Sequence, residues 1–139
     1  MSDWDEDSPK LRANLRQALR DIREDALRRV KPTVAASRAW HGTIMDRLTT
    51  PGPQYVGRFR GEPGLEGCNV VVGNYPGVSP GQVEEELVAF EKKLQIAAEA
   101  LDRKIKPGQD MSGDDDVAAV IDLCAWVHSE WVRIHPPLT

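Results

Sequence analysis

The sequence predicts a mainly α-helical protein that carries one small β-hairpin. Apolar residues recur with the spacing of an α-helix in four segments, and serine residues that suit helix N-caps precede three of these segments. One segment rich in proline and glycine divides the second helix from the third. A chain of 139 residues has an ordinary length for one domain with its own core, so we expect a single domain over residues 1–139.

The first predicted helix runs from about residue 9 to residue 31. Ser8 and Pro9 form a helix start, because a serine hydroxyl caps free N–H groups and proline at the first position loses no bond. The segment from Lys10 to Lys31 holds eight Lys and Arg residues against three acidic residues, so this helix is basic. A solvated face is the simpler interpretation, and a site for an acidic partner is the alternative. Its apolar positions are Leu11, Leu15, Leu19, Ile22, Ala26, Leu27 and Val30.

The second predicted helix covers Thr33 to Leu48, and the sequence TTPGPQ ends it because proline and glycine interrupt the helical hydrogen bonds. Further on, CNVVVGNYPGV joins a β-branched run to a turn-rich limb, which predicts a β-hairpin flap over residues 69–78. Two strands alone are only marginally stable in water. We therefore expect the flap to pack against the helices or against a bound partner.

The third and fourth predicted helices follow the flap. Ser79 and Pro80 start the third, and KPGQD ends it. Ser112 followed by GDDD starts the fourth, which we expect over residues 112–135, since carboxylates suit the positive end of a helix dipole. The apolar stripes are Val83, Leu87, Phe90, Leu94, Ala97 and Leu101 in the third helix, and Val117, Val120, Ile121, Cys124, Val127, Trp131 and Ile134 in the fourth.

Composition narrows the class of protein. The chain is 40% hydrophobic and 29% charged, which is typical of globular proteins, and no run approaches the ~20 apolar residues that cross a bilayer. Its acidic start is unlike a secretory leader, so we expect a cytoplasmic protein that binds no membrane. The net charge of −4 argues against nucleic acid as the main partner. Cys68 and Cys124 could form one disulfide, although we favour reduced thiols in the core.

The order of motifs resembles the Fic family of protein-modifying enzymes. AWHGTIMDRL resembles the helix before the family's flap, YVGRFR resembles its short lead-in, NVVVGNYPGVSP resembles the flap, and WVRIHP resembles the entry to the family signature. The resemblance covers residues 40–136. It implies a Fic-like helical bundle, a catalytic His135, and a flap at Val70, Val71 and Val72 that docks the target protein by strand addition.

The resemblance also implies a chemistry that this chain only partly matches. Members of the family mostly move AMP from ATP, with Mg²⁺, to a hydroxyl of a target protein, and their signature continues as HPFx[D/E]GNGRxxR. His135 would take the hydroxyl proton. Here Pro137, Leu138 and Thr139 follow, with no metal-binding carboxylate, glycine nest or arginine. We therefore expect an inactive chain with no cofactor and no metal site of its own.

A bundle that lacks the helices after the signature exposes apolar surface, at a cost of about 25 cal/mol per Å². We therefore expect self-association, partner binding or marginal stability. The partner would be a protein target or an inhibitor protein.

Several alternatives remain open on the sequence alone. His135 could simply end a helix, since a cation suits the C-terminal end of the dipole and proline often follows. Cys124, His128 and His135 share spacing on one helix face, which allows a metal site but offers no completing carboxylate. The chain could instead be a non-catalytic helical interaction module of the toxin–antitoxin type, or an early-ending form of a longer active protein.

Overall fold

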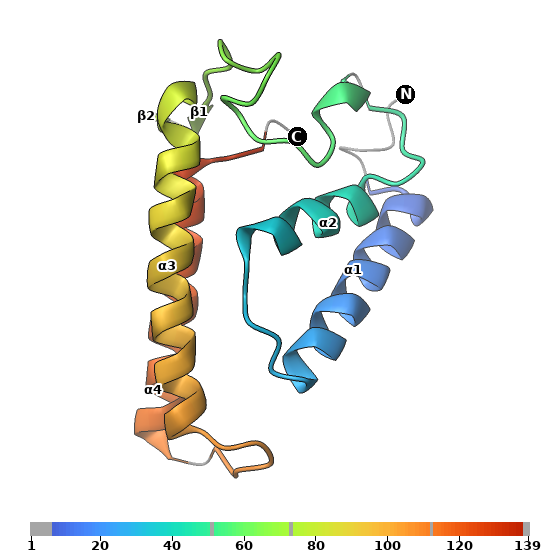
Figure 1. The fold of residues 1–139 in the computed structure, drawn as a ribbon. Coiled ribbons are helices and arrows are strands. Elements are labelled where there is room, and N and C mark those ends of the chain that lie inside the picture. Colours follow the sequence, from blue (N-terminus) through green and yellow to red (C-terminus); the bar gives the residue numbers. More distant parts are fainter. Residues whose placement is uncertain (1–6, 51, 73, 112, 138–139) are drawn as a thin grey trace. The chain divides into compact units, whose positions relative to one another are not determined.

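The computed structural model describes residues 7–50, 52–72, 74–111 and 113–137, and these form a mainly helical protein with one two-stranded hairpin. Along the chain come α1 (Pro9–Leu27), α2 (Val34–Ile44), a short 3₁₀ turn (Pro53–Tyr55), β1 (Val71–Val72), β2 (Tyr75–Pro76), α3 (Pro80–Lys104) and α4 (Asp114–Ile134), as Figure 1 shows. The predicted fold class, mainly α with a small β-hairpin, is confirmed.

Two compact units divide the chain. The N-terminal unit holds the described residues up to Phe59 together with Pro137, and the C-terminal unit holds those from Arg60 to Pro136. Each is described by itself below. That both units belong to one domain over residues 1–139 stays a prediction.

The N-terminal unit is built from α1 and α2. Ser8 caps α1 as predicted, since its Oγ accepts a hydrogen bond from the Leu11 N–H at 3.0 Å. Thr33 caps α2 through a bond from the Ala36 N–H at 3.1 Å. The Asn14 side chain of α1 donates to the backbone carbonyl of Ile44 at 2.9 Å, which ties the two helices together. Hydrogen bonds therefore fix the ends of both helices.

The first helix ends earlier than the sequence predicts, at Leu27 and not near residue 31. Arg29 adopts a left-handed φ of 53°, its N–H bonds to the Ala26 carbonyl, and the Val30 N–H bonds to the Asp25 carbonyl. This pair of bonds is the Schellman motif, which usually carries glycine at the left-handed position. Arginine occupies it here, so the sequence holds no glycine to mark the end. The second helix likewise ends at Ile44, before the predicted Leu48.

The C-terminal unit is built on α3 and α4, which lie side by side and run antiparallel (Figure 1). Val83, Leu87 and Phe90 on α3 are buried, as the predicted stripe requires, and Ile134 at the end of α4 is fully buried. The Phe90 ring stacks on Trp126 of α4 with centroids 5.4 Å apart. This apolar contact holds the two helices together along the half that leads to the hairpin.

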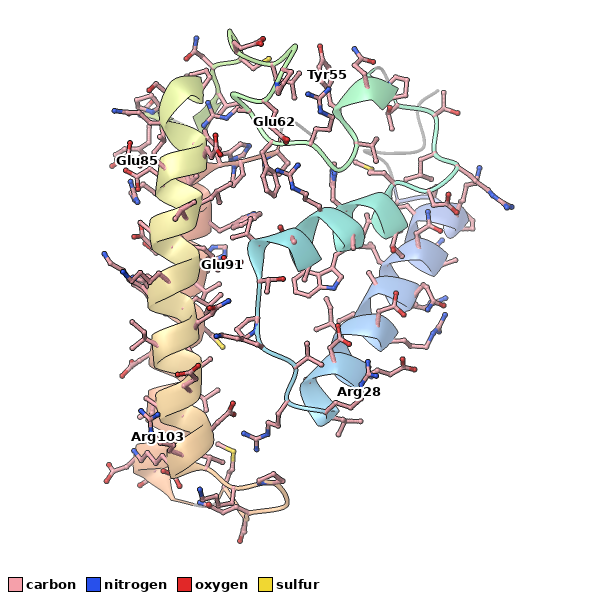
Figure 2. The ribbon with its side chains drawn as sticks, viewed as in Figure 1. Arg28, Tyr55, Glu62, Glu85, Glu91 and Arg103 are labelled. Atoms are coloured by element: carbon pink, nitrogen blue, oxygen red, sulfur yellow. The ribbon has the colours of Figure 1, made fainter. Side chains whose placement is uncertain are left out.

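The outer sides of these helices are solvated. Charged side chains, among them Glu85, Glu91 and Arg103, occur along the whole length of α3 (Figure 2). The predicted stripe of α4 is buried only in part, because Val117, Ile121 and Cys124 are exposed. Both cysteines are free, but the expectation that Cys124 lies in the core is wrong. No helix of the described residues has the length and apolar character needed to cross a bilayer.

Candidate functional site

His135 lies at the C-terminal end of α4 and caps it. Its backbone is left-handed, with φ 47° and ψ 65°, and its N–H bonds to the Trp131 carbonyl at 2.7 Å. Residues other than glycine rarely adopt this conformation, and histidine is among the few that do so with some frequency. Pro136 follows and is buried, and it cannot continue the helix. The imidazole is thus carried at a fixed helix end, half-buried.

The hairpin lies where the sequence predicts it, within residues 69–78. Val71 pairs with Pro76 and Val72 pairs with Tyr75 in antiparallel register. The Gly77 N–H bonds to the Val70 carbonyl at 2.9 Å. The exposed fractions of Val71 and Tyr75 are 66% and 79%, so the strand faces are open to solvent.

The two edges of this hairpin differ. Opposed residues of an antiparallel pair alternate between mutually hydrogen-bonded and outward-pointing backbone groups. Because the Gly77 N–H bonds to the Val70 carbonyl, this pair is a hydrogen-bonded one, and the next pair, Val71 and Pro76, directs its backbone groups outward. Val71 offers both an N–H and a C=O there, whereas Pro76 has no N–H. Only the β1 edge can therefore both donate to and accept from an added strand.

The return limb of the hairpin is joined to the helix end that carries His135. The Val78 N–H bonds to the Arg133 carbonyl of α4 at 3.2 Å. A Cβ atom on Gly77 would lie 2.7 Å from Cγ2 of Val70 and 3.5 Å from Cβ of His135. The contact with Val70 is too close for a side chain at position 77, whereas the distance to His135 is an ordinary van der Waals contact, so glycine lets the two limbs of the hairpin pack closely beside the helix terminus.

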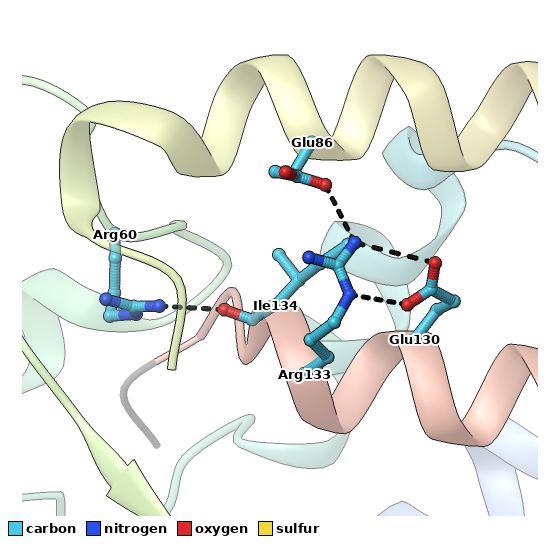
Figure 3. Close-up of polar contacts among 5 residues, drawn as sticks. All are labelled: Arg60, Glu86, Glu130, Arg133 and Ile134. Atoms are coloured by element: carbon cyan, nitrogen blue, oxygen red, sulfur yellow. Dashed lines mark hydrogen bonds and ion pairs between the residues drawn. The ribbon is translucent and has the colours of Figure 1, made fainter. Parts of the chain in front are cut away.

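Arg60 is buried at the centre of this junction, with an exposed fraction of 1%. Its guanidinium donates four hydrogen bonds to backbone carbonyls: to Cys68 at 3.0 Å, Val78 at 2.5 Å, Ile134 at 2.7 Å and His135 at 2.8 Å. Figure 3 shows the bond to Ile134. The last carbonyls of a helix lack partners within it and carry the negative end of its dipole, so a cation suits this position.

A second arginine, Arg133, lies two residues before His135 on the exposed side of α4. Arg133 donates to Glu86 of α3 at 2.7 Å and to Glu130 of α4 at 2.6 Å (Figure 3). The hydrogen bond from Arg133, more than any other contact, lowers the pKa of Glu86. Arg133 therefore bridges α3 and α4 beside the site and has its charge matched by carboxylates.

The surroundings of His135 favour its neutral form. Burial lowers the pKa of His135, and the positive charge of Arg60 lowers it further. A neutral imidazole can accept a proton, which is the first requirement of a general base.

The structure places the predicted site residues as follows. Val70 and His135 both lie against Gly77, and Val71 lies on the open edge of β1. The backbone of Val72 pairs in β1, and its side chain lies outside the described residues. The catalytic role of His135 and the docking role of the flap stay predictions.

The alternative metal site at Cys124, His128 and His135 is not completed by further ligand residues among the described ones. Cys124 and His128 are exposed on α4, and no group of three or more His, Cys, Asp or Glu side chains able to hold a metal ion occurs in the described part of the chain. Asp114 to Asp116 form the first turn of α4, where Asp116 contacts Lys104 at 3.5 Å. These carboxylates act as helix-start residues.

Sequence reasoning missed Arg60. The motif YVGRFR was noticed for its family resemblance, but no pattern in it marks which arginine is buried. The signal in the sequence is that Arg60 stands directly before Gly61. In the structure Gly61 has a φ of 89°, and a Cβ there would lie 2.0 Å from the Pro80 carbonyl oxygen. A glycine forced by close backbone approach indicates that its neighbour enters a tightly packed junction.

A groove lies farther along the same two helices. Its volume is about 510 Å³, and α3 and α4 line it mainly with apolar side chains such as Ala97, Leu101, Leu123 and Trp126, with Lys93 at its margin. It belongs to the half of the helix pair away from His135.

Comparison with known proteins does not assign this chain to a family. No family model matches the sequence, and no curated protein matches it. The site therefore has to be interpreted from its own geometry.

Proposed function

We propose that this chain is a Fic-like protein-binding module whose hairpin docks an extended segment of a target protein beside His135. One observation carries the proposal: the return limb of the hairpin is hydrogen-bonded to the last turn of α4, which ends in His135. A segment added to the hairpin would therefore be held at a set position from the imidazole. The resemblance of WVRIHP and NVVVGNYPGVSP to the family supports the same assignment.

The docking edge is that of β1. Val71 supplies the outward N–H and C=O that a strand needs, and Pro76 leaves the β2 edge without a donor. Main-chain bonds of this kind give affinity for an extended peptide without requiring a particular sequence. The ligand class is therefore an extended protein segment, with a Ser, Thr or Tyr hydroxyl presented to His135.

His135 is the proton acceptor in this proposal. Its lowered pKa keeps the imidazole neutral at neutral pH, so the ring can accept the proton of a docked hydroxyl. This step positions and activates a nucleophile, but it does not supply an electrophile.

The residues present do not fit ATP and Mg²⁺. Arg60 is buried and bonded to four carbonyls, and Arg133 is bonded to two carboxylates, so neither arginine at this helix end is placed to bind a triphosphate. We therefore propose that this chain by itself transfers no AMP. Separately, we propose that the protein is cytoplasmic.

Peptide binding tests the docking function. A library of short extended peptides, each with a central Ser, Thr or Tyr, is screened against the full chain, and binders are measured by fluorescence anisotropy. Val71→Pro removes the outward N–H and should abolish binding, while the matched control Val71→Thr keeps that N–H and should bind like the parent. The Gly77 amide, bonded within the hairpin, reports by hydrogen exchange whether the hairpin survives each change.

The docking proposal fails if no peptide in the library binds, or if Val71→Pro binds as well as Val71→Thr. The chemical half is tested separately with radiolabelled ATP and Mg²⁺. We expect no label on the chain or on a bound peptide, and robust transfer would contradict the assignment of an inactive chain.

A second function is favoured by a row of exposed apolar residues on α4. Val117, Ile121 and Val132 are 39%, 60% and 40% exposed and lie on one face of the helix. Such a row supports a helical interaction module that binds a protein partner or a second copy of itself. Light scattering should show a larger species for the parent chain than for Ile121→Lys, whereas equal masses for both would remove self-association through this row.

A further inference from the structure

We propose that Arg60 is the positioning residue of this site: its guanidinium holds the return limb of the hairpin and the last turn of α4 together, so that the docking edge and His135 move as one body. The consequence for target binding rests on the proposed function. The mechanical claim does not, because it concerns only contacts within the C-terminal unit.

The guanidinium joins three segments that are distant in sequence. It bonds to the carbonyl of Cys68 before β1, to that of Val78 after β2, and to those of Ile134 and His135 at the end of α4. These four bonds use four of the five N–H donors that an arginine side chain has. Removing them would leave carbonyls from both the hairpin and the helix without a shared partner.

Only arginine has the shape for this role. Its planar fork directs donors along several fixed directions, whereas a lysine ammonium is a compact charge on a flexible stem. The bonds to Ile134 and His135 also neutralise the carbonyls that end α4, where the helix dipole is negative. Burial lowers the pKa of Arg60, but a guanidinium remains protonated in proteins.

The main chain around Arg60 reinforces the same junction. Its own N–H bonds to the Pro136 carbonyl at 2.8 Å, so both its backbone and its side chain contact the segment after α4. A Cβ on Gly77 would lie 3.0 Å from Nη2 of Arg60. The absence of a side chain at Gly77 therefore lets the guanidinium reach Val78.

His135 connects this geometry to chemistry. Arg60 is the charged group that faces it, and Arg133 on the same helix end is occupied by Glu86 and Glu130. A change at Arg60 should therefore alter two separate observables: the opening of the hairpin and the protonation of His135. A residue that only contributes to general stability would alter neither selectively.

NMR on the full chain tests the proposal with Arg60→Lys and Arg60→Met, and with Arg133→Met as the matched control at the same helix end. Hydrogen exchange is followed at the amides of Gly77 and Val78, with the Leu87 amide as a core reference, and the His135 ring is titrated. Arg60→Lys keeps the charge but loses the fork, so we expect Gly77 and Val78 to exchange about tenfold faster or more while Leu87 is unchanged. Arg60→Met should in addition raise the pKa of His135, and Arg133→Met should leave all three observables unchanged.

Exchange at Gly77 and Val78 within about twofold of the parent in Arg60→Lys would overturn the proposal. Equal acceleration at Leu87 would also overturn it, because it would show general loosening. Should Arg60→Met fail to fold, the lysine variant and its exchange pattern decide the outcome. The peptide screen with Val71→Pro and Val71→Thr tests the docking function separately, so a failure of either proposal is visible without the other.

Discussion

The two compact units of this chain are stabilised in different ways. The C-terminal unit buries large apolar side chains and a guanidinium at a junction of three segments; its buried residues include Leu65, Val83, Leu87, Phe90, Ile105, Ile134 and Arg60. In the N-terminal unit the buried apolar side chains are Ala18, Met45 and Phe59, while Leu15, Leu19 and Leu27 on α1 are exposed. Its described contacts are mostly caps and side-chain bonds to backbone groups, such as those of Ser8, Thr33 and Asn14.

This difference locates rigidity beside the candidate site. Apolar burial contributes about 25 cal/mol per Å², whereas a typical hydrogen bond contributes about 1 kcal/mol net. The unit with the apolar core therefore carries most of the packing free energy, and that unit holds both His135 and the hairpin. Changes of equal size in the two units should consequently have unequal effects.

The largest expected effect is in the core of the C-terminal unit. Phe90→Ala removes a buried ring that stacks on Trp126, so we expect a loss of about 3–5 kcal/mol in the free energy of unfolding. Leu19→Ala on α1 is the control in the other unit, where a half-exposed side chain should cost at most about 0.5 kcal/mol. Urea unfolding followed by circular dichroism measures both losses. Similar losses in the two variants would show that the two units do not differ in how they are stabilised.

A smaller effect is expected at the caps of the N-terminal unit. Thr33→Ala removes the oxygen that accepts from the Ala36 N–H, at a cost of about 1 kcal/mol. Thr33→Ser keeps the oxygen and should be close to neutral. Faster amide exchange at Ala36 in the alanine variant alone would support the cap, and identical exchange in both variants would exclude it.

Acidification should weaken the C-terminal unit through His135. Because burial and Arg60 hold the pKa of His135 below its value in the unfolded chain, the unfolded state binds the proton first as the pH falls. The free energy of unfolding should therefore decrease as the pH falls through about 6.5, and the decrease should stop below the folded pKa. His135→Asn should show a shallower pH dependence between neutral and mildly acidic pH, and an unchanged slope would contradict the lowered pKa.

The smallest effect is expected at the exposed ion pairs of Arg133. Arg133→Met breaks its contacts with Glu86 and Glu130 but should cost only about 0.5 kcal/mol, since solvated pairs contribute little. Loss of the bond from Arg133 should also raise the pKa of Glu86 toward its ordinary value. Carbon-detected NMR titration of Glu86 measures this shift, and an unchanged pKa of Glu86 in Arg133→Met would contradict the role of this bond.

Local signals predicted much of the fold. Ser8 with Pro9 starts α1, the β-branched run before Gly73 forms β1, and α3 starts at Pro80 directly after Ser79. These features depend on neighbouring residues, which is why a single sequence reveals them. The predicted cap of the fourth helix, Ser112, lies outside the described residues, and Gly113 caps α4 in the structure.

The remaining features depend on long-range contacts. Arg29 ends α1 in a conformation that usually indicates glycine, and α4 leaves Cys124 exposed although it shares a stripe with the fully buried Ile134. Arg60 meets carbonyls up to 75 positions away in the chain, so its burial could not be predicted from local pattern. The sequence placed the hairpin correctly, the site roles of His135 and the flap stay predictions, and Arg60, which joins the two, was found only in three dimensions.

The left-handed backbone at His135 has a consequence for experiments on this imidazole. A residue with a Cβ costs about 1–2 kcal/mol more than glycine in that conformation. Replacement of His135 by glycine should thus relieve backbone strain while it deletes the ring, and the chain should remain folded. Position 135 therefore allows the proposed proton acceptor to be removed with little risk that a lost activity merely reflects an unfolded chain.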